Sequence, residues 1–246
     1  MRAIILAAGV GRRLGEHGDN PKCLLEFGGR SLLDRHISNL QTLNISDITL
    51  CVGYRRALIE SAVRDLGYAA VRATVNDEYE LGSIVSLWAT REVLRSGEDI
   101  ILMDADVLYA TEIIQALFKA PLANRFLFDR NFIPGDEPVK ICLQAGQIVE
   151  FRKRVADKLT YNDCGESVGF FSLKSAMAIK LAEATERYIA EDRRNEPYEE
   201  AIRDIALASP QEFEIKDVTG SAWIEIDFPE DIVRAREEIL PKIDDK

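Results

Sequence analysis

Glycines and basic residues gather near the start of the chain in a pattern that suits phosphate binding. The segment from Leu6 to Gly15 reads Leu-Ala-Ala-Gly-Val-Gly-Arg-Arg-Leu-Gly, and Pro21-Lys22 follows it. Glycines after a strand expose backbone N–H groups that bind phosphate oxygens, and they let the backbone approach a ligand closely. The spacing matches neither the P-loop of ATPases nor the dinucleotide fingerprint. We therefore predict a phosphate site of another type, to which Arg12, Arg13 and Lys22 add positive charge.

A second candidate site consists of acidic residues in the middle of the chain. Asp104 and Asp106 come directly after the strand-like run Asp99–Met103. Two carboxylates one residue apart point to one side of an extended chain, and the carboxyl ends of parallel strands bind ligands in open α/β sheets. Mg²⁺ prefers such oxygen ligands and shares them with substrate phosphates. The pair therefore predicts a magnesium site. The alternative is a cap for the helix expected from about Thr111, a role that suits Thr111 itself better.

The N-terminal pattern resembles the signature of the nucleotidyltransferases that make NDP-sugars and CDP-alcohols. That signature reads Leu-Ala-Ala-Gly-x-Gly-x-Arg-Leu-Gly, with Pro-Lys about ten residues later, and we align it with one extra arginine before Leu14. The segment Asn76–Trp88, read as Asn-x-x-Tyr…Ser-Leu-Trp, looks like the branch that activates phosphocholine and related small phosphates. The resemblance extends over essentially the whole chain.

The resemblance also implies which residues bind the nucleotide and the metal. Arg12 and Lys22 are the implied catalytic groups, on the β- and γ-phosphates and on the α-phosphate respectively. The implied nucleotide-binding residues are Leu6, Ala7, Ala8, Gly9, Gly11, Arg12, Gly82, Ser83 and Asp104. Asp106 and Asp227 match the family's two ligands for Mg²⁺, the implied cofactor, although Ala105 stands where the family has glycine. Whether Asp104 or Glu225 joins the metal ligands stays open.

Residues of about 125–166 resemble the family's insertion that receives the second substrate. The implied acceptor-binding residues are Lys140, Glu150, Lys153, Glu166 and Ser167. For most of these charged residues, a solvated hairpin face is the competing interpretation. Aromatic residues could form walls around a quaternary ammonium group or belong to the core: Tyr79, Trp88, Tyr161, Phe170 and Trp223. We expect His36 to be a packed core histidine rather than a catalytic one.

The implied reaction is transfer of a cytidylyl group from CTP to a small phosphate or phosphonate, such as phosphocholine or an aminoalkylphosphonate, with release of pyrophosphate. One alternative is a sugar- or inositol-phosphate nucleotidyltransferase that uses another NTP. A glycosyltransferase with Asp104-Ala105-Asp106 as its metal motif would bind an NDP-sugar, but it has no need of a loop that holds departing pyrophosphate. A nucleotide sensor without turnover would not need the matching Lys22, Asp106 and Asp227.

Strand-like and helix-like segments alternate along the first half of the chain, which is typical of a parallel sheet covered on both faces. The expected strands there are Arg2–Ala7, Ile48–Gly53, Ala69–Val75 and Asp99–Met103, and helices are expected from Ser31, over Arg55–Leu66 and from Gly82 to about Arg95. Alternating apolar residues predict a hairpin of Val139–Leu143 and Gln147–Phe151. We predict a single α/β, Rossmann-like three-layer domain over residues 1–246, with a mixed, mostly parallel central sheet and a small β-hairpin insertion.

Composition limits the partners. The chain has 246 residues and a formal net charge of −11, which argues against a nucleic-acid backbone or an anionic membrane surface as main partner. The four cysteines show no metal-ligand spacing. No signal-peptide pattern or membrane-spanning stretch is present, so a cytoplasmic protein is expected. The sequence leaves the oligomeric state open, with a homodimer as one option.

Overall fold

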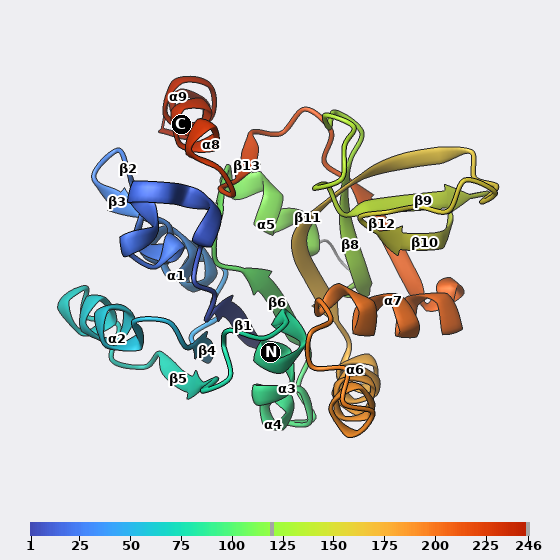
Figure 1. Cartoon of the computed structure of the whole chain (residues 1–246), viewed down its shortest axis with the longest axis horizontal. Coiled ribbons are helices and arrows are strands. Elements are labelled where there is room, and N and C mark those ends of the chain that lie inside the picture. The colour runs from blue at the N-terminus through green and yellow to red at the C-terminus, as the bar shows by residue number, and fades with distance from the viewer. Residues whose placement is uncertain (119–120, 245–246) are drawn as a thin grey trace.

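The computed structural model describes residues 1–118 and 121–244, and its central feature in that part of the chain is a nine-stranded mixed sheet (Figure 1). Seven strands follow the order β10-β9-β11-β6-β1-β4-β5, while β8 pairs with β11 and β12. Their bounds are β1 Arg2–Ala7, β4 Ile48–Val52, β5 Arg72–Val75, β6 Ile100–Asp104, β8 Asn124–Asp129, β9 Lys140–Gln144, β10 Gln147–Arg152, β11 Asp163–Leu173 and β12 Phe213–Asp217. This architecture confirms the predicted fold class.

One half of the sheet is parallel. The strand β1 pairs in parallel with β4 and β6, and β4 pairs in parallel with β5. Hydrophobic residues alternate along β1 between two cores: Ile4 packs on one face, and Ala3 and Ile5 pack on the other. The sheet is therefore buried from both sides, and the carboxyl ends of β1 and β6 meet at one edge.

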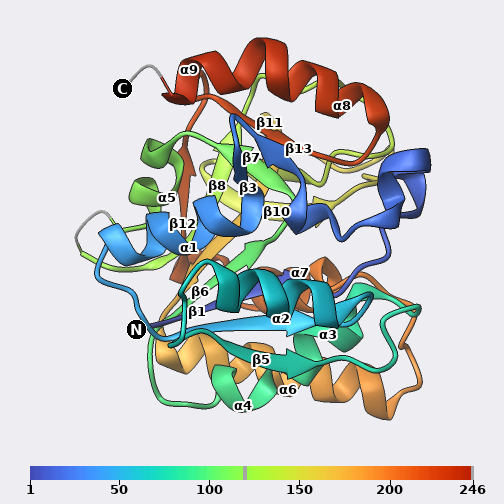
Figure 2. The ribbon, with the colours of Figure 1, turned by 90° about the vertical axis from the view of Figure 1, so that its left-hand side faces the viewer.

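Helices cover both faces and create the three layers. The helices are α1 Leu32–Thr42, α2 Arg56–Asp65, α3 Ser83–Ala89, α4 Arg91–Leu94, α5 Thr111–Leu117, α6 Ser175–Ala190, α7 Glu199–Ala208, α8 Pro229–Arg234 and α9 Leu240–Asp244. Figure 2 shows α1 and α5 on one side of the sheet, and α3, α4 and α6 on the other. Ser31 caps α1 as expected, because its hydroxyl accepts a hydrogen bond from the Asp34 N–H.

The strand β11 joins the parallel half to an antiparallel half. Its last residues pair with β6 and its first residues pair with β9, while β8 runs along its other edge. Gly169 interrupts the strand with φ +78°, in the left-handed region that favours glycine. The bend turns β11 toward the hairpin of β9 and β10, whose turn at Ala145 and Gly146 also has positive φ at both residues.

Small elements complete the edge at which the strands end. They are the 3₁₀ helices η1 Arg12–Asp19 and η2 Lys22–Leu24, the π-helical turn η4 Ala235–Ile239, and the strand pairs β2 Glu26–Phe27 with β3 Arg30–Ser31 and β7 Val107–Tyr109 with β13 Trp223–Glu225. A third apolar cluster, which includes Leu14, Leu108, Ile226 and Ile232, packs α8 against this region. The C-terminal segment is thereby fixed next to the N-terminal loop. The 3₁₀ helix η3 Pro210–Glu212 lies at the opposite edge, directly before β12.

Three details differ from the sequence-based expectations. The strand expected over Ala69–Val75 begins only at Arg72. The helix expected to reach Arg95 is broken at Thr90 into α3 and α4. The strand β12 was not expected, although its alternating Phe-Glu-Ile-Lys-Asp residues are typical of a strand at a sheet edge. The predicted limits of the insertion, 125–166, stay a prediction.

The helices and the cysteines can be compared with the expectations from composition. Within the described ranges, no helix combines the length and hydrophobicity needed to cross a membrane. All four cysteines are free thiols. Cys142 and Cys164 are partners on adjacent strands, with their sulfur atoms 3.8 Å apart.

Candidate active site

Two adjoining cavities lie at the edge where β1 and β6 end. We call the first the glycine-loop cavity; it has a volume of about 380 Å³ and is lined by residues of the segment 6–13, by Lys22 and by Asp104 and Asp106. We call the second the insertion cavity; it has a volume of about 410 Å³ and is lined by the loop 131–138, Glu166 and Trp223. Glu225 and Asp227 line both cavities.

The glycine loop leaves β1 at Ala7 and needs glycine where it turns. Gly11 has φ +66°, and a Cβ there would lie 3.2 Å from Cγ of Lys22. The predicted loop residues Leu6, Ala7, Ala8, Gly9, Gly11 and Arg12 all line the glycine-loop cavity. The structure thus places the predicted loop beside a cavity, and its binding of a nucleotide stays a prediction.

Lys22 lies between the two predicted metal ligands. Its Nζ donates to Asp106 Oδ2 at 2.9 Å and to Asp227 Oδ1 at 2.7 Å. Burial alone would lower the pKa of Lys22, but the two carboxylates outweigh burial and raise it, so the ammonium stays charged. Burial would likewise raise the pKa of Asp227, but Lys22 and then Arg13 hold it below its usual value.

Arg13, expected from the sequence only to add positive charge near the loop, contacts several residues of the site directly. Its NH2 group donates to Asp227 at 3.1 Å, its NH1 group donates to Glu137 at 2.6 Å, and its guanidinium stacks 5.0 Å from the ring centre of Phe228. Arg12 is exposed and also lines the cavity. The family signature places its arginine directly before leucine, so Arg13, which precedes Leu14, is the better match and Arg12 is the variable residue.

Glu225, not Asp104, groups with the predicted metal ligands. Carboxylate oxygens of Asp106, Glu225 and Asp227 all lie within 4.8 Å of one another. Asp104 instead accepts a hydrogen bond from the Tyr198 hydroxyl at 2.7 Å. Burial, and then the Asp106 carboxylate nearby, raises the pKa of Asp104 well above its usual value, and the same causes act on Glu225.

The turn before α8 places Asp227. Asp231 caps this helix: its Oδ2 accepts hydrogen bonds from the backbone N–H groups of Asp227 and Phe228, at 3.0 and 2.8 Å. Asp227 follows β13 rather than ending it, because β13 stops at Glu225. The cap therefore holds the Asp227 backbone directly beside Lys22.

Gly82, predicted to bind the nucleotide, lies in a contact between two loops. Gly82 is absent from the cavity lining, and its N–H donates to the Arg194 carbonyl at 2.9 Å. A Cβ at this position would lie 2.2 Å from the Glu196 carbonyl oxygen, so glycine permits close packing of two loops. Ser83 does line the cavity, and its hydroxyl accepts a hydrogen bond from the Tyr198 N–H at 2.9 Å.

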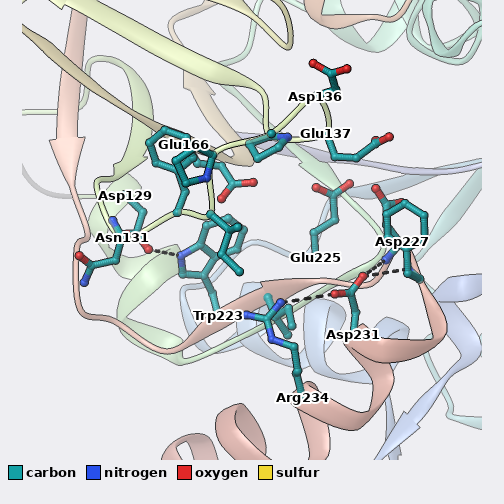
Figure 3. A pocket seen from close by; sticks show the side chains of 17 residues that line it. Asp129, Asn131, Asp136, Glu137, Glu166, Trp223, Glu225, Asp227, Asp231 and Arg234 are labelled. Carbon is teal, nitrogen blue, oxygen red and sulfur yellow. Dashed lines mark hydrogen bonds and ion pairs between the residues drawn. The ribbon is translucent and has the colours of Figure 1, made fainter.

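The insertion cavity presents carboxylates and aromatic rings. Figure 3 shows the carboxylates of Glu166 and Glu225 directed into the space between the loop 131–138 and β13. Asp129 is satisfied by the Trp223 indole N–H at 2.7 Å and the Asn131 N–H at 2.8 Å. Burial, and then the charge of Asp129, raises the pKa of Glu166 to about 7.

Three of the five predicted acceptor residues do not line either cavity. Lys140 Nζ donates to the carbonyls of Gly135 and Lys153, both at 2.6 Å, and so ties the hairpin to the loop. Ser167 is buried and accepts a hydrogen bond from the Gly169 N–H. Glu150 is buried in a two-point ion pair with Arg203 of α7. Lys140 and Glu150 are thus bound to other parts of the chain, the loop 131–138 and α7, and Ser167 is bonded within its own strand.

The other predicted site residues differ in their positions. Lys153 lines the glycine-loop cavity and Glu166 the insertion cavity. Among the aromatic candidates, Tyr79 and Trp223 line cavities, but Phe170 is fully buried, Trp88 lies against the core and Arg91, and Tyr161 belongs to a separate hollow near Leu159. His36 is packed as expected: it contacts Tyr109 and the Ala105 carbonyl, and burial lowers its pKa to about 4.

Comparisons with known proteins agree with this geometry. Residues 3–158 match the MobA-like NTP transferase domain. The chain is 30% identical, over 94% of its length, to the CMP-5'-(3-aminopropyl)phosphonate synthase of Streptomyces rubellomurinus, but it spans only 37% of that protein. It is 23% identical to the CTP:phosphoglutamine cytidylyltransferase of Campylobacter jejuni, over 94% of this chain and 98% of that one. The inositol-1-phosphate CTP transferase of T. maritima shares the fold, with a TM-score of 0.75 and 22% identity over 98% of this chain and 95% of that one.

The ion pair of Glu150 gives a prediction that separates a packing role from acceptor binding. Arg203→Met leaves the buried Glu150 carboxylate without its partner, so we expect the free energy of unfolding to fall by about 3 kcal/mol. Urea denaturation followed by circular dichroism measures this change. Arg95→Met is the matched control, because it breaks an exposed pair with Glu186 and should cost less than about 1 kcal/mol. Equal stability of the two variants would contradict the packing role.

Proposed function

This chain belongs to the family of MobA-like NTP transferase domains, and from that membership we propose that it transfers the cytidylyl group of CTP to a small phosphate or phosphonate. The observation that carries the proposal is the joint presence of the glycine loop, Lys22 and the carboxylates of Asp106 and Asp227 at one cavity, with a second cavity beside it. The choice of CTP is supported by the names of the two relatives, one a CMP-phosphonate synthase and the other a CTP-dependent cytidylyltransferase.

The residues present fit a divalent metal ion. The Lys22 ammonium between Asp106 and Asp227 is a stand-in cation, which shows that these two carboxylates can share one positive charge. Glu225 adds a third carboxylate within reach, and all three offer the oxygen ligands that Mg²⁺ prefers. Asp106 and Asp227, with Glu225 beside them, would hold Mg²⁺, which when bound supplies positive charge to the triphosphate.

In the proposed reaction, residues of this chain bind the phosphates and position the reacting groups. The N–H groups of the glycine loop and the Arg13 and Arg12 guanidinium groups bind the β- and γ-phosphates, and Lys22 moves from its carboxylates to the α-phosphate. An acceptor phosphate oxygen forms a bond to the α-phosphorus while the bond to the β-phosphate oxygen breaks, and pyrophosphate leaves. The attacking oxygen is already ionised at neutral pH, so no general base is needed. Positioning and charge neutralisation supply the catalysis.

The insertion cavity favours an acceptor that bears a positively charged nitrogen. Glu166 faces the cavity beside Asp129, and the ring of Trp223 forms part of the wall. A carboxylate in a partly apolar pocket attracts a cationic group strongly, because little water screens the charges. A cation over an aromatic ring adds about 0.5–2 kcal/mol of binding free energy. Aminoalkylphosphonates and phosphocholine-like phosphates carry such a nitrogen, and the name of the Streptomyces relative contains an aminopropyl phosphonate.

The metal ligands give the first test of this function. Asp106→Asn and Asp227→Asn should each abolish Mg²⁺-dependent pyrophosphate release, because each removes one carboxylate from the cluster. Asp104→Asn should be milder, since Asp104 bonds to Tyr198 and lies outside the cluster. Pyrophosphate release at increasing Mg²⁺ concentration measures the effect. An inactive Asp104→Asn enzyme together with an active Asp106→Asn enzyme would place the ligand at residue 104 instead.

Lys22 gives a test with two opposite readouts. Lys22→Met should lower turnover by a factor of about 10²–10³, the usual cost of one lost donor to the reacting group. The same variant should bind Mn²⁺ more tightly than the wild type in the absence of nucleotide, because the ammonium no longer competes for Asp106 and Asp227. Electron paramagnetic resonance of free Mn²⁺ measures the binding. Lys180→Met, which removes a surface lysine paired with Glu212, is the control. Near wild-type turnover would remove Lys22 from the mechanism.

The acceptor preference is tested by comparing kcat/KM with CTP for phosphocholine, phosphoethanolamine, 2-aminoethylphosphonate, inositol 1-phosphate and glucose 1-phosphate. We expect the three nitrogen compounds to win by a factor of about two to thirty, which corresponds to one cation–aromatic contact. Glu166→Gln should remove much of the preference. A clear win for inositol or glucose phosphate would refute the cation argument and leave nucleotidyl transfer standing.

The same cavity predicts a pH dependence. Since the pKa of Glu166 is about 7, the carboxylate is largely protonated at pH 6 and ionised at pH 8. Affinity for a cationic acceptor should therefore rise with pH across this range. The acceptor phosphate itself titrates near pH 6, so Glu166→Gln serves as the reference and should show the shallower rise. Parallel pH profiles for the two enzymes would contradict the role of Glu166.

A further inference from the structure

Glu137 connects the two cavities. It lies on the loop 131–138 that lines the insertion cavity, yet its Oε2 accepts from Arg13 NH1 at 2.6 Å and from Lys153 Nζ at 3.2 Å. Arg13 and Lys153 both line the glycine-loop cavity. A single carboxylate of the acceptor side therefore holds two cations of the nucleotide side.

The residues that the Arg13 guanidinium contacts line the insertion cavity. Its guanidinium pairs with Glu137 and Asp227 and stacks on Phe228, and these three residues line that cavity. Arg13 itself comes from the glycine loop, at the start of η1. Alternating charges thus run from Lys153 through Glu137, Arg13 and Asp227 to Lys22, so a displacement of the loop 131–138 changes the surroundings of groups proposed to bind phosphate.

Exposure indicates that this pair has little effect on folding. The Arg13 and Glu137 side chains are 44% and 49% exposed, and exposed ion pairs contribute little to stability. A carboxylate that adds little to folding but fixes two cations at a cavity edge acts by positioning them. Lys140 supports this arrangement, since its ammonium binds the carbonyls of Gly135 on the loop and of Lys153 on the hairpin.

We propose that Glu137 is a positioning residue that couples the acceptor site to the nucleotide site, so that each substrate tightens the binding of the other. An acceptor in the insertion cavity holds the loop 131–138 in place, and Glu137 then keeps Arg13 and Lys153 aligned for the phosphates of the nucleotide. The coupling is reciprocal, because two linked binding equilibria affect each other by the same factor. This inference rests on the proposed function and adds a residue and a coupling to it.

The test measures binding without turnover. Calorimetry gives the Kd of α,β-methylene-CTP, whose α–β bridge cannot be cleaved, with Mg²⁺ and with or without saturating 2-aminoethylphosphonate. The acceptor should tighten nucleotide binding at least about fivefold in the wild type, the lower end of typical couplings between sites. In Glu137→Gln the two Kd values should agree within twofold.

Glu186→Gln is the matched control. It weakens an arginine–glutamate pair of the same length, 2.6 Å between Arg95 NH2 and Glu186 Oε2, with side chains 34% and 40% exposed and outside both cavities. It should keep the wild-type coupling. Coupling that persists in Glu137→Gln, or that is absent from the wild type, would overturn the inference. So would nucleotide binding that becomes tighter in Glu137→Gln whether or not acceptor is present, because Glu137 would then only compete with phosphate for Arg13.

A second measurement does not depend on the identity of the acceptor. Amide hydrogen exchange of the loop 131–138 should slow when α,β-methylene-CTP binds to the wild type, and should stay unchanged in Glu137→Gln. Equal protection of the loop in both proteins would refute the link. Failure of the proposed function shows itself differently: the wild type would neither bind the nucleotide nor release pyrophosphate from CTP with any acceptor of the panel.

Discussion

Two carboxylates brought together at the edge of a sheet repel each other unless a cation lies between them, and the architecture of this site depends on that balance. Asp106 follows β6 in the middle of the chain, whereas Asp227 follows β13 near the C-terminus. Lys22, from the N-terminal segment, places its ammonium within hydrogen-bond distance of both. Three distant parts of the chain thus meet through charge. The same lysine is the group that we propose to bind the α-phosphate, so the contact that stabilises the edge also holds that group in place.

The bend of β11 beside this edge requires a glycine. The bend of β11 at Gly169 brings the strand past β6 so closely that a Cβ at this residue would lie 2.2 Å from Asp104 Oδ2. Before the bend, β11 pairs with β9, which places Glu166 at the wall of the insertion cavity, and after the bend it pairs with β6. A side chain at this point would displace the Asp104 carboxylate. The second cavity therefore arises from a local backbone requirement.

Charged residues in the insertion divide into two classes that look the same in the sequence. Glu150 and Lys140 bind Arg203 and backbone carbonyls, whereas Glu137 and Lys153 lie at the border of the two cavities. Spacing along a hairpin predicts which side chains share a face, but it does not tell which face is covered by a helix. The helix α7 packs against β10, and its Arg203 pairs with Glu150, so this carboxylate is not available at either cavity.

Local patterns were sufficient to predict the three-layer α/β fold and the glycine loop after the first strand, and the motifs shared with the nucleotidyltransferases pointed to Lys22, Asp106 and Asp227. These features depend on hydrophobic periodicity, on turn residues and on short motifs, all of which are written in neighbouring positions. Only the tertiary structure decided that Arg13 contacts Asp227 and Glu137, that Glu225 rather than Asp104 joins the carboxylate cluster, and that Gly82 serves loop packing. Each of these depends on contacts between segments far apart in the chain, and such contacts are set by how sheets bend and helices pack rather than by any local spacing.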